Sequence, residues 1–335
     1  MGGSAIADLL RGAGVRTGGI VTFRFFRNLL ENVWGDIEAV TDTRSFDYAK
    51  DRPMQVTAGG VEWLERHGRE GPFALFLHYD GPHMPYRLPD AHAGTFATVA
   101  DEAVAADVRR VLFPQEQERI EVGDNARTSP MFRLLEDIDW GRRRLDAATL
   151  AWIRDKYDAS VRYNDEAIGV FLDALAATGL AAGTVVCVLS DHGEAFLEHG
   201  GIAHGGIHLY EEVIRTVGLI RDPGGRAPAG SRIAAPLGHV GVLPTLLELA
   251  AVPGWEALAD EGFAGALADP GAGAPAPVFC QGKAKIAVRA GRHKLVKTRP
   301  NPALTRLQRL RILAKMILRR AAGDEVFDLE ADPAE

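Results

Sequence analysis

The 335-residue sequence lacks several features that would assign it to a specialised class of protein. Its two cysteines, Cys187 and Cys280, are too few for a disulfide framework or a cysteine-based zinc site. No run of about 18 apolar residues occurs, so we expect no helix that crosses a membrane. An excess of basic charge is also missing: 38 basic residues face 45 acidic ones, for a net charge of −7. This balance argues against a general nucleic-acid binder.

The N-terminal segment has neither the basic nor the apolar stretch of a signal peptide. Read literally, with Met1 as the genuine start, this absence predicts a chain that stays in the cytoplasm. The composition is otherwise that of an ordinary globular protein, with 47% hydrophobic and 25% charged residues. The length allows one large domain or two domains of ordinary size.

Apolar runs of strand length alternate with helical patterns along most of the chain. We predict strands at residues 18–23, 72–79, 184–189 and 217–221, and helices at residues 4–12, 54–68, 147–179 and 240–251. Strands that alternate with helices in this way predict an α/β fold with a parallel or mostly parallel sheet.

Two stretches depart from this alternation. Residues 89–146 are polar and poorly periodic, and we expect a helical and irregular insertion that shapes the substrate pocket. Residues 253–277 are rich in glycine, alanine and proline and are predicted to be a linker. Short apolar runs then predict a small antiparallel subdomain with strands at 278–281, 286–289 and 293–297. The predicted domains are residues 1–270 and 271–335.

Six of the ten histidines fall in two glycine-rich windows: His78, His83, His192, His199, His204 and His208. A single histidine is usually a packed or solvated side chain. Here, however, His83 follows one predicted strand and Asp191 with His192 follows another, and ligands of open α/β sheets bind beyond such strand ends. Aspartate and histidine together suit a divalent cation. Two ligands are too few to hold a divalent cation, since Zn²⁺ takes about four ligands and Ca²⁺ about six or more. The spacing of residues does not show where the remaining ligands come from.

Seven stretches, in the same order, resemble the sulfatase family of the alkaline-phosphatase superfamily. Ser190-Asp191-His192-Gly193 is similar to the family's metal-binding segment, and the strand that leads to Pro82-His83-Met84-Pro85-Tyr86 is similar to another family segment. The seven stretches are residues 6–17, 73–86, 157–169, 189–194, 209–215, 244–249 and 326–333. The resemblance implies a sulfatase-like, mostly parallel sheet flanked by helices, with a small antiparallel C-terminal subdomain.

The resemblance also implies roles for individual residues. Asp191 and His192 would be metal ligands, with Ca²⁺ as the first choice and Mn²⁺, Mg²⁺ or Zn²⁺ as alternatives. His83 would contact the ester oxygens or assist the leaving group. His204 would be a second substrate-binding or acid–base histidine, and His208 is the alternative for that role. A supporting or structural role is expected for Glu194, Glu198 and His199.

One part of the family pattern is missing from this sequence. The family's nucleophile lies in a Cys/Ser-x-Pro-Ser/Thr-Arg motif near the N-terminus, with two metal-binding aspartates before it. Neither Cys187 nor Cys280 is followed by such a motif, and no paired aspartates stand near Met1. We therefore expect an N-terminally truncated chain with poor metal affinity, which is weakly active or inactive.

Three function classes follow. The first is a metal-dependent hydrolase of sulfate esters that acts on a small molecule or a glycan. The second is a phosphoester or phosphonate-ester hydrolase of the same superfamily, since an Asp-His pair does not separate the two. The third is a non-catalytic binding module or an incomplete gene product. The oligomeric state is left open.

Residues 303–322 form a basic amphipathic pattern outside the family resemblance. They contain six basic residues, no acidic ones, and leucine or isoleucine at helical spacing. The pattern favours a surface helix on the C-terminal subdomain, and peripheral membrane contact is the alternative.

Overall fold

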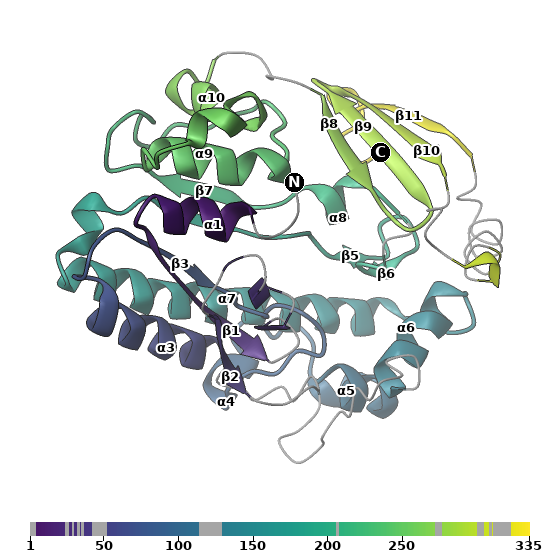
Figure 1. The fold of residues 1–335 in the computed structure, drawn as a ribbon. Helices are drawn as coiled ribbons and strands as arrows, with labels where there is room; N and C mark the ends of the chain where they lie inside the picture. The colour runs from purple at the N-terminus through teal and green to yellow at the C-terminus, as the bar shows by residue number, and fades with distance from the viewer. Residues whose placement is uncertain are drawn as a thin grey trace. The chain divides into compact units, whose positions relative to one another are not determined.

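The chain folds into two compact units in the computed structural model (Figure 1). The first comprises Met1–Asp137 and Arg143–Ala182, and the second Ile138–Arg142 and Gly183–Glu335. The structure describes residues 5–23, 27–28, 30–31, 34, 37–41, 52–113, 129–205, 208–271, 277–299, 305–307, 310 and 323–335. The predicted domain boundary at residue 270 stays a prediction.

The first unit contains a parallel sheet. Its strands β1 (Arg16–Phe23), β2 (Ile37–Thr41) and β3 (Phe73–Leu77) lie in the order β2-β1-β3. In register, Arg16 lies opposite Phe73, and Gly19 lies opposite Ile37. The two apolar runs that predicted strands here are confirmed as β1 and β3.

Three helices of this unit are α1 (Ala5–Gly12), α3 (Arg52–His67) and α7 (Ala147–Ala177). Helix α3 packs against the sheet and also against α7 (Figure 1), and the hydroxyl of Thr57 in α3 donates to the carbonyl oxygen of Ala167 in α7 at 2.7 Å. A Cβ atom on Gly60 of α3 would come within 2.9 Å of Leu77 and 3.0 Å of Phe171. Glycine therefore allows the close approach of α3 to both neighbours.

Where the structure describes them, residues 89–146 are helical and irregular as predicted, and their role in shaping a substrate pocket stays a prediction. The insertion contains α4 (Asp90–Ala93), the 3₁₀ helix η1 (Asp101–Ala103), α5 (Ala106–Leu112) and α6 (Pro130–Asp139). Lys156 of α7 is buried against it, and its ammonium donates to the carbonyl oxygen of Ala93 at 2.8 Å. The insertion is thus anchored to the long helix.

The second unit is built around antiparallel pairs. Strand β4 (Val186–Leu189) runs antiparallel to β7 (Gly218–Arg221), and β5 (Ala195–Phe196) runs antiparallel to β6 (Ile202–Ala203). The predicted strands at 184–189 and 217–221 are confirmed, but this pair is antiparallel, and among the described residues the parallel pairings lie in the sheet of the first unit. The 3₁₀ helix η3 (Leu180–Gly183) precedes β4, and the short helix α8 (Glu211–Ile214) precedes β7. The 3₁₀ helix η4 (His239–Gly241) and helix α9 (Val242–Leu249) follow β7.

The predicted antiparallel C-terminal sheet is confirmed. It contains β8 (Val278–Gln281), β9 (Lys285–Ala290), β10 (His293–Thr298) and β11 (Glu325–Asp328), in the order β11-β10-β9-β8. The sulfatase-like fold class therefore stands, with a parallel sheet, flanking helices and an antiparallel C-terminal sheet.

The linker predicted at 253–277 is wrong for most of its length. The 3₁₀ helix η5 (Trp255–Glu261) and α10 (Ala264–Ala268) form there. Phe263 and Leu267 are buried in one cluster with Leu249 of α9. The backbone N–H of Phe263 also donates to the hydroxyl of Thr245 at 2.8 Å. Two apolar anchors fix this segment despite its glycine- and alanine-rich composition.

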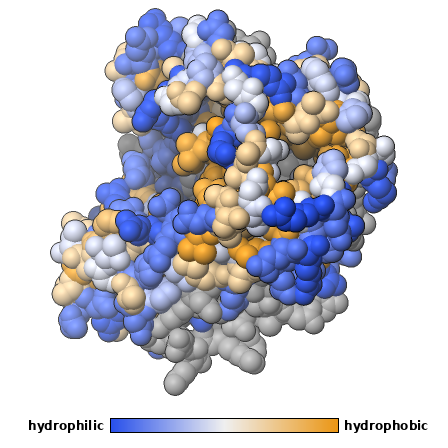
Figure 2. Space-filling view, turned by 90° about the vertical axis from the view of Figure 1, so that its left-hand side faces the viewer, coloured by the Kyte–Doolittle hydropathy of each residue, from blue (hydrophilic) through white to orange (hydrophobic). Residues whose placement is uncertain are grey.

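Among the described residues, no helix is both long enough and apolar enough to cross a bilayer. On the face drawn in Figure 2, hydrophilic residues cover much of the surface, and apolar residues show between them in patches. The basic pattern at 303–322 lies almost entirely outside the described residues, so both of its interpretations stay predictions.

Candidate active site

The turn after β4 is held firmly at both ends. Ser190 donates its N–H to the carbonyl oxygen of Val217 at 3.1 Å, and its hydroxyl accepts the N–H of Val217 at 2.9 Å. Gly193 donates to the carbonyl oxygen of Val213 at 2.7 Å. A Cβ atom on Gly193 would lie 2.2 Å from the carbonyl oxygen of Glu212, so only glycine fits this position.

The two residues inside this turn are the predicted metal ligands. The side chain of Asp191 is 88% exposed, and its Oδ1 accepts the backbone N–H of His192 at 2.9 Å. His192 donates from Nδ1 to the carbonyl oxygen of Gly193 at 2.7 Å, since a carbonyl oxygen can only accept. In the neutral imidazole, Nε2 then carries the lone pair, and it lies 3.6 Å from Oδ2 of Asp191.

A second imidazole lies directly on the first. The rings of His192 and His204 stack with centroids 4.0 Å apart and planes at 29°. Glu194, whose side chain is 4% exposed, accepts Nδ1 of His204 at 3.0 Å. Each of the two rings is therefore tied to a protein acceptor through Nδ1, as is usual for ligating or substrate-binding histidines.

His199 has a different environment from its neighbours. Its Nδ1 lies 2.9 Å from Oε1 of Glu212, its Nε2 lies 3.1 Å from the backbone oxygen of Glu335, and its ring stacks on Tyr210 at 3.7 Å. Burial lowers the pKa of His199, but the hydrogen bonds and negative charges of Glu212 and Glu335 outweigh it and raise the pKa overall. Both ring nitrogens of His199 are engaged by protein acceptors, and the structural role expected for His199 stays a prediction.

Tyr210 extends this packed region. Its hydroxyl donates to Oε1 of Glu325 at 2.7 Å. Burial and the acceptor carboxylate of Glu325 both raise the pKa of Tyr210. The tyrosine therefore stays neutral and serves as a hydrogen-bond donor.

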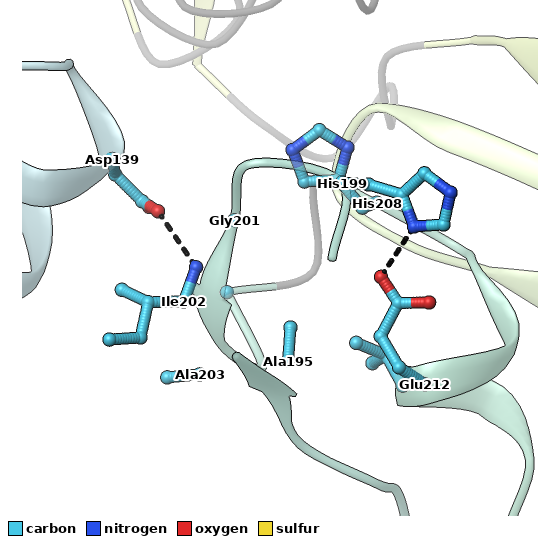
Figure 3. Close-up of a pocket in the computed structure, with 10 residues that line it drawn as sticks. Asp139, Ala195, His199, Gly201, Ile202, Ala203, His208 and Glu212 are labelled. Atoms are coloured by element: carbon cyan, nitrogen blue, oxygen red, sulfur yellow. Dashed lines mark hydrogen bonds and ion pairs between the residues drawn. The ribbon is translucent and has the colours of Figure 1, made fainter. Parts of the chain in front are cut away.

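His208, the alternative to His204, lies against this packed region. Its ring stacks with Tyr210 at 5.6 Å. Together with Asp139, His199 and Glu212 it lines a small pocket (Figure 3). Oδ1 of Asp139 accepts the N–H of Ile202 on the wall of this pocket at 3.4 Å. The structure thus pairs His204, rather than His208, with the ring of His192.

His83 lies in the first unit, in the turn after β3. Its N–H donates to the carbonyl oxygen of Asp80 at 3.0 Å, and its Nδ1 donates to the carbonyl oxygen of Met84. The carboxylate of Asp80, whose side chain is 10% exposed, pairs with the buried Arg52 at 2.7 Å. This ion pair thus anchors the turn that carries His83, whose predicted role stays a prediction.

Sequence reasoning did not find either of two features of these turns. The Arg52–Asp80 pair joins residues 28 positions apart, and no local pattern announces it. The sequence gives a weak indication of the contact between Glu194 and His204, because the two residues lie at equal distances from the middle of a glycine-rich turn. Such symmetry is typical of a hairpin.

The donor types near residue 191 match a divalent cation, but their number does not complete a site. Among the described residues, no group of three histidine, cysteine or acidic side chains is arranged to hold a metal ion. Asp191 and His192 supply two ligands, against the about four that Zn²⁺ takes and the about six or more that Ca²⁺ takes.

A family model described as Sulfatase matches residues 3–252 of the chain. The chain belongs to the sulfatase family. It is 27% identical over 194 residues to a protein named sulfatase from Formosa agariphila, an alignment that covers 56% of this chain and 35% of that relative. The chain matches 35% to 37% of the length of this relative and of two proteins named arylsulfatase K, from Danio rerio and Gallus gallus.

Solved structures share the fold of this sulfatase-family chain. One is a protein in complex with its substrate D-glucosamine-2-N,6-O-disulfate, with a TM-score of 0.66 at 18% identity, covering 98% of this chain and 76% of that chain. Another is the phosphonate monoester hydrolase of Agrobacterium radiobacter, with a TM-score of 0.60 at 16% identity, covering 98% and 74%. At these identities the likeness shows a shared fold, and the predicted family and fold are confirmed.

Proposed function

We propose that this chain functions in the hydrolysis of sulfate esters carried by a small molecule or a glycan. Family membership supports the reaction class, and the solved neighbour that binds a disulfated glucosamine supports the kind of substrate. The observation that carries the proposal is the stacked pair His192 and His204. Each imidazole is fixed through Nδ1, and Nε2 is the nitrogen that we propose to face a ligand.

The chemistry proposed for His204 follows from its fixed ring. During ester hydrolysis, negative charge grows on the non-bridging and leaving oxygens. In its cationic form, His204 can donate from Nε2 to such an oxygen while the carboxylate of Glu194 stabilises the ring charge. Asp191 and His192 are proposed to contact a divalent cation, Ca²⁺ first. His83 keeps the role that the family resemblance implies, and His208 is the alternative to His204.

The test is a hydrolysis assay on the full chain with p-nitrophenyl sulfate, in the presence of Ca²⁺, Mg²⁺, Mn²⁺ or Zn²⁺. If the wild-type chain turns over, we expect His204→Gln to lower kcat/KM by about 10² to 10⁴, the usual range for loss of an acid–base group. His293→Gln is the matched control, because His293 is an exposed histidine of the same unit. Equal losses in both variants, or no turnover by the wild type, would contradict the proposal.

A phosphonate- or phosphate-ester hydrolase is the second candidate. The shared fold with a phosphonate monoester hydrolase favours it, and Asp-His turns suit both ester types. Parallel assays with p-nitrophenyl phosphate and a phenylphosphonate monoester separate the two. A kcat/KM that is highest for a phosphorus ester would replace the sulfate assignment.

A binding module is the third candidate, favoured by the incomplete ligand set among the described residues. It predicts a folded chain that binds inorganic sulfate, measured by calorimetry, but hydrolyses none of the three esters. Its binding would still require His204.

A further inference from the structure

Two glutamate–histidine pairs lie within one short stretch of the second unit. Glu194 pairs with His204 at 3.0 Å, and Glu212 pairs with His199 at 2.9 Å. The pairs differ in what the second ring nitrogen does. Nε2 of His199 is hydrogen-bonded to the backbone oxygen of Glu335, whereas the ring of His204 stacks on that of the predicted metal ligand His192.

The hairpin β5–β6 is what brings Glu194 to His204. Ala195 lies opposite Ala203 in the antiparallel register, so the residues just outside, Glu194 and His204, also face each other. The side chain of Glu194 is 4% exposed and that of His204 is 24% exposed. The carboxylate is therefore enclosed, while the imidazole reaches toward solvent.

The protonation pattern of this pair follows from elementary chemistry. An ionised carboxylate can only accept hydrogen bonds, so Nδ1 of His204 must carry the proton. In the neutral imidazole the other nitrogen then has the lone pair. An unconstrained ring would not be held in this tautomer, and its plane would be free to turn.

We propose that Glu194 is a positioning residue that fixes neutral His204 in the Nδ1–H tautomer, so that Nε2 is the nitrogen that gains a proton and, in the cationic form, donates it to the bound ester. This role rests on the proposed hydrolytic function of the same turn, but the tautomer itself can be measured without turnover. Glu194 acts through His204 and does not touch the substrate.

The experiment uses the full chain labelled with ¹⁵N-histidine, in long-range ¹H–¹⁵N spectra recorded at alkaline pH, where imidazoles are neutral. His204→Gln assigns the resonances of His204. In the wild type we expect a protonated Nδ1 and an unprotonated Nε2. Glu194→Leu should move the proton to Nε2, whereas Glu194→Gln, which keeps an acceptor oxygen, should preserve the wild-type tautomer.

Glu212→Leu is the matched control, because it removes the other partly buried glutamate partner of a histidine. It should change the signals of His199 and leave those of His204 unchanged. The wild-type spectrum decides the tautomer even if a variant fails to fold. Protonation of Nε2 in the wild type, or an unchanged tautomer in folded Glu194→Leu, would overturn the proposal.

Kinetics separate this inference from the function on which it rests. With p-nitrophenyl sulfate, Glu194→Leu should lower kcat/KM by about 10- to 100-fold, mostly through kcat, as supporting partners of active-site histidines usually do. Glu194→Gln should recover part of the loss. If no ester is hydrolysed, the proposed function fails while the tautomer result stands on its own.

Discussion

Two charged regions of the second unit contrast in how their charges are matched. In the buried charge cluster, Lys285, Lys294 and Arg289 of the C-terminal sheet pair with carboxylates. These carboxylates belong to Glu211, Glu325 and Glu335. In the turn after β4, the carboxylate of Asp191 is 88% exposed and lies beside an imidazole at 3.6 Å.

The contrast teaches which charges maintain the fold and which are available to a ligand. The side chain of Lys294 has no exposed area and lies 3.2 Å from Glu211 and 2.5 Å from Glu335. Charges so deeply buried are tolerated only when they are paired. The carboxylate of Asp191 stays in water, and so it remains able to bind a cation or polar group.

The largest effect should come from breaking the buried charge cluster. Lys294→Met leaves the carboxylates of Glu211 and Glu335 buried without their shared ammonium, which typically costs about 3–5 kcal/mol. Urea unfolding of the full chain measures the loss. Lys297→Met is the matched control on the same strand, because Lys297 is exposed and pairs with Asp324 only at 3.8 Å.

The control should change the free energy of unfolding by at most about 1 kcal/mol, the usual limit for exposed pairs. If both lysine variants lose the same amount, the pairing in the cluster does not stabilise the fold. In that case the contrast between the two regions is one of geometry only.

A smaller effect is expected at His199, which lies between the two regions. Its pKa is raised in the folded chain, with the carboxylates of Glu212 and Glu335 outweighing burial. A raised folded pKa means that the stabilisation is fully present below the pKa of histidine in the unfolded chain, near 6.5. It is then lost as the pH rises through the higher folded value.

The measurement compares wild type and His199→Gln in urea from pH 5 to 9. The stability gap between them should be widest at the acidic end and shrink toward the alkaline end. A gap that is constant with pH, or that widens as the pH rises, would show that the charge of His199 does not contribute.

The outline of the fold could be predicted because strong apolar runs, such as the one that became β4, determine local structure by themselves. The linker prediction failed because alanine- and glycine-rich composition says nothing of tertiary anchors such as Phe263 and Leu267. The buried lysines were also invisible. A lysine in a strand is predicted to be exposed unless its acidic partner is known. For Lys285 that partner, Glu325, lies 40 residues away in the sequence.

The candidate site was predicted in part for a related physical reason. Asp191 and His192 follow a strand end, and local sequence reveals that placement. The contact of Glu194 with His204 depends on a hairpin with only two residue pairs, too short for an alternating pattern to show. The preference for His204 over His208 came from the family resemblance and stays a prediction, whereas the contact of His204 with Glu194 needed the three-dimensional register.

The smallest effect on stability should come from Asp191, and it sharpens the contrast most. Asp191→Asn changes a side chain that is 88% exposed, so the free energy of unfolding should stay within about 0.5 kcal/mol of wild type. The Kd for Ca²⁺, measured by calorimetry on the full chain, should rise by about tenfold or more, because a charged ligand oxygen becomes neutral. A variant that is less stable but binds Ca²⁺ as the wild type does would place Asp191 with the structural charges. The opposite result, unchanged stability with weakened binding, would separate the exposed turn from the buried charge cluster by function as well as by burial.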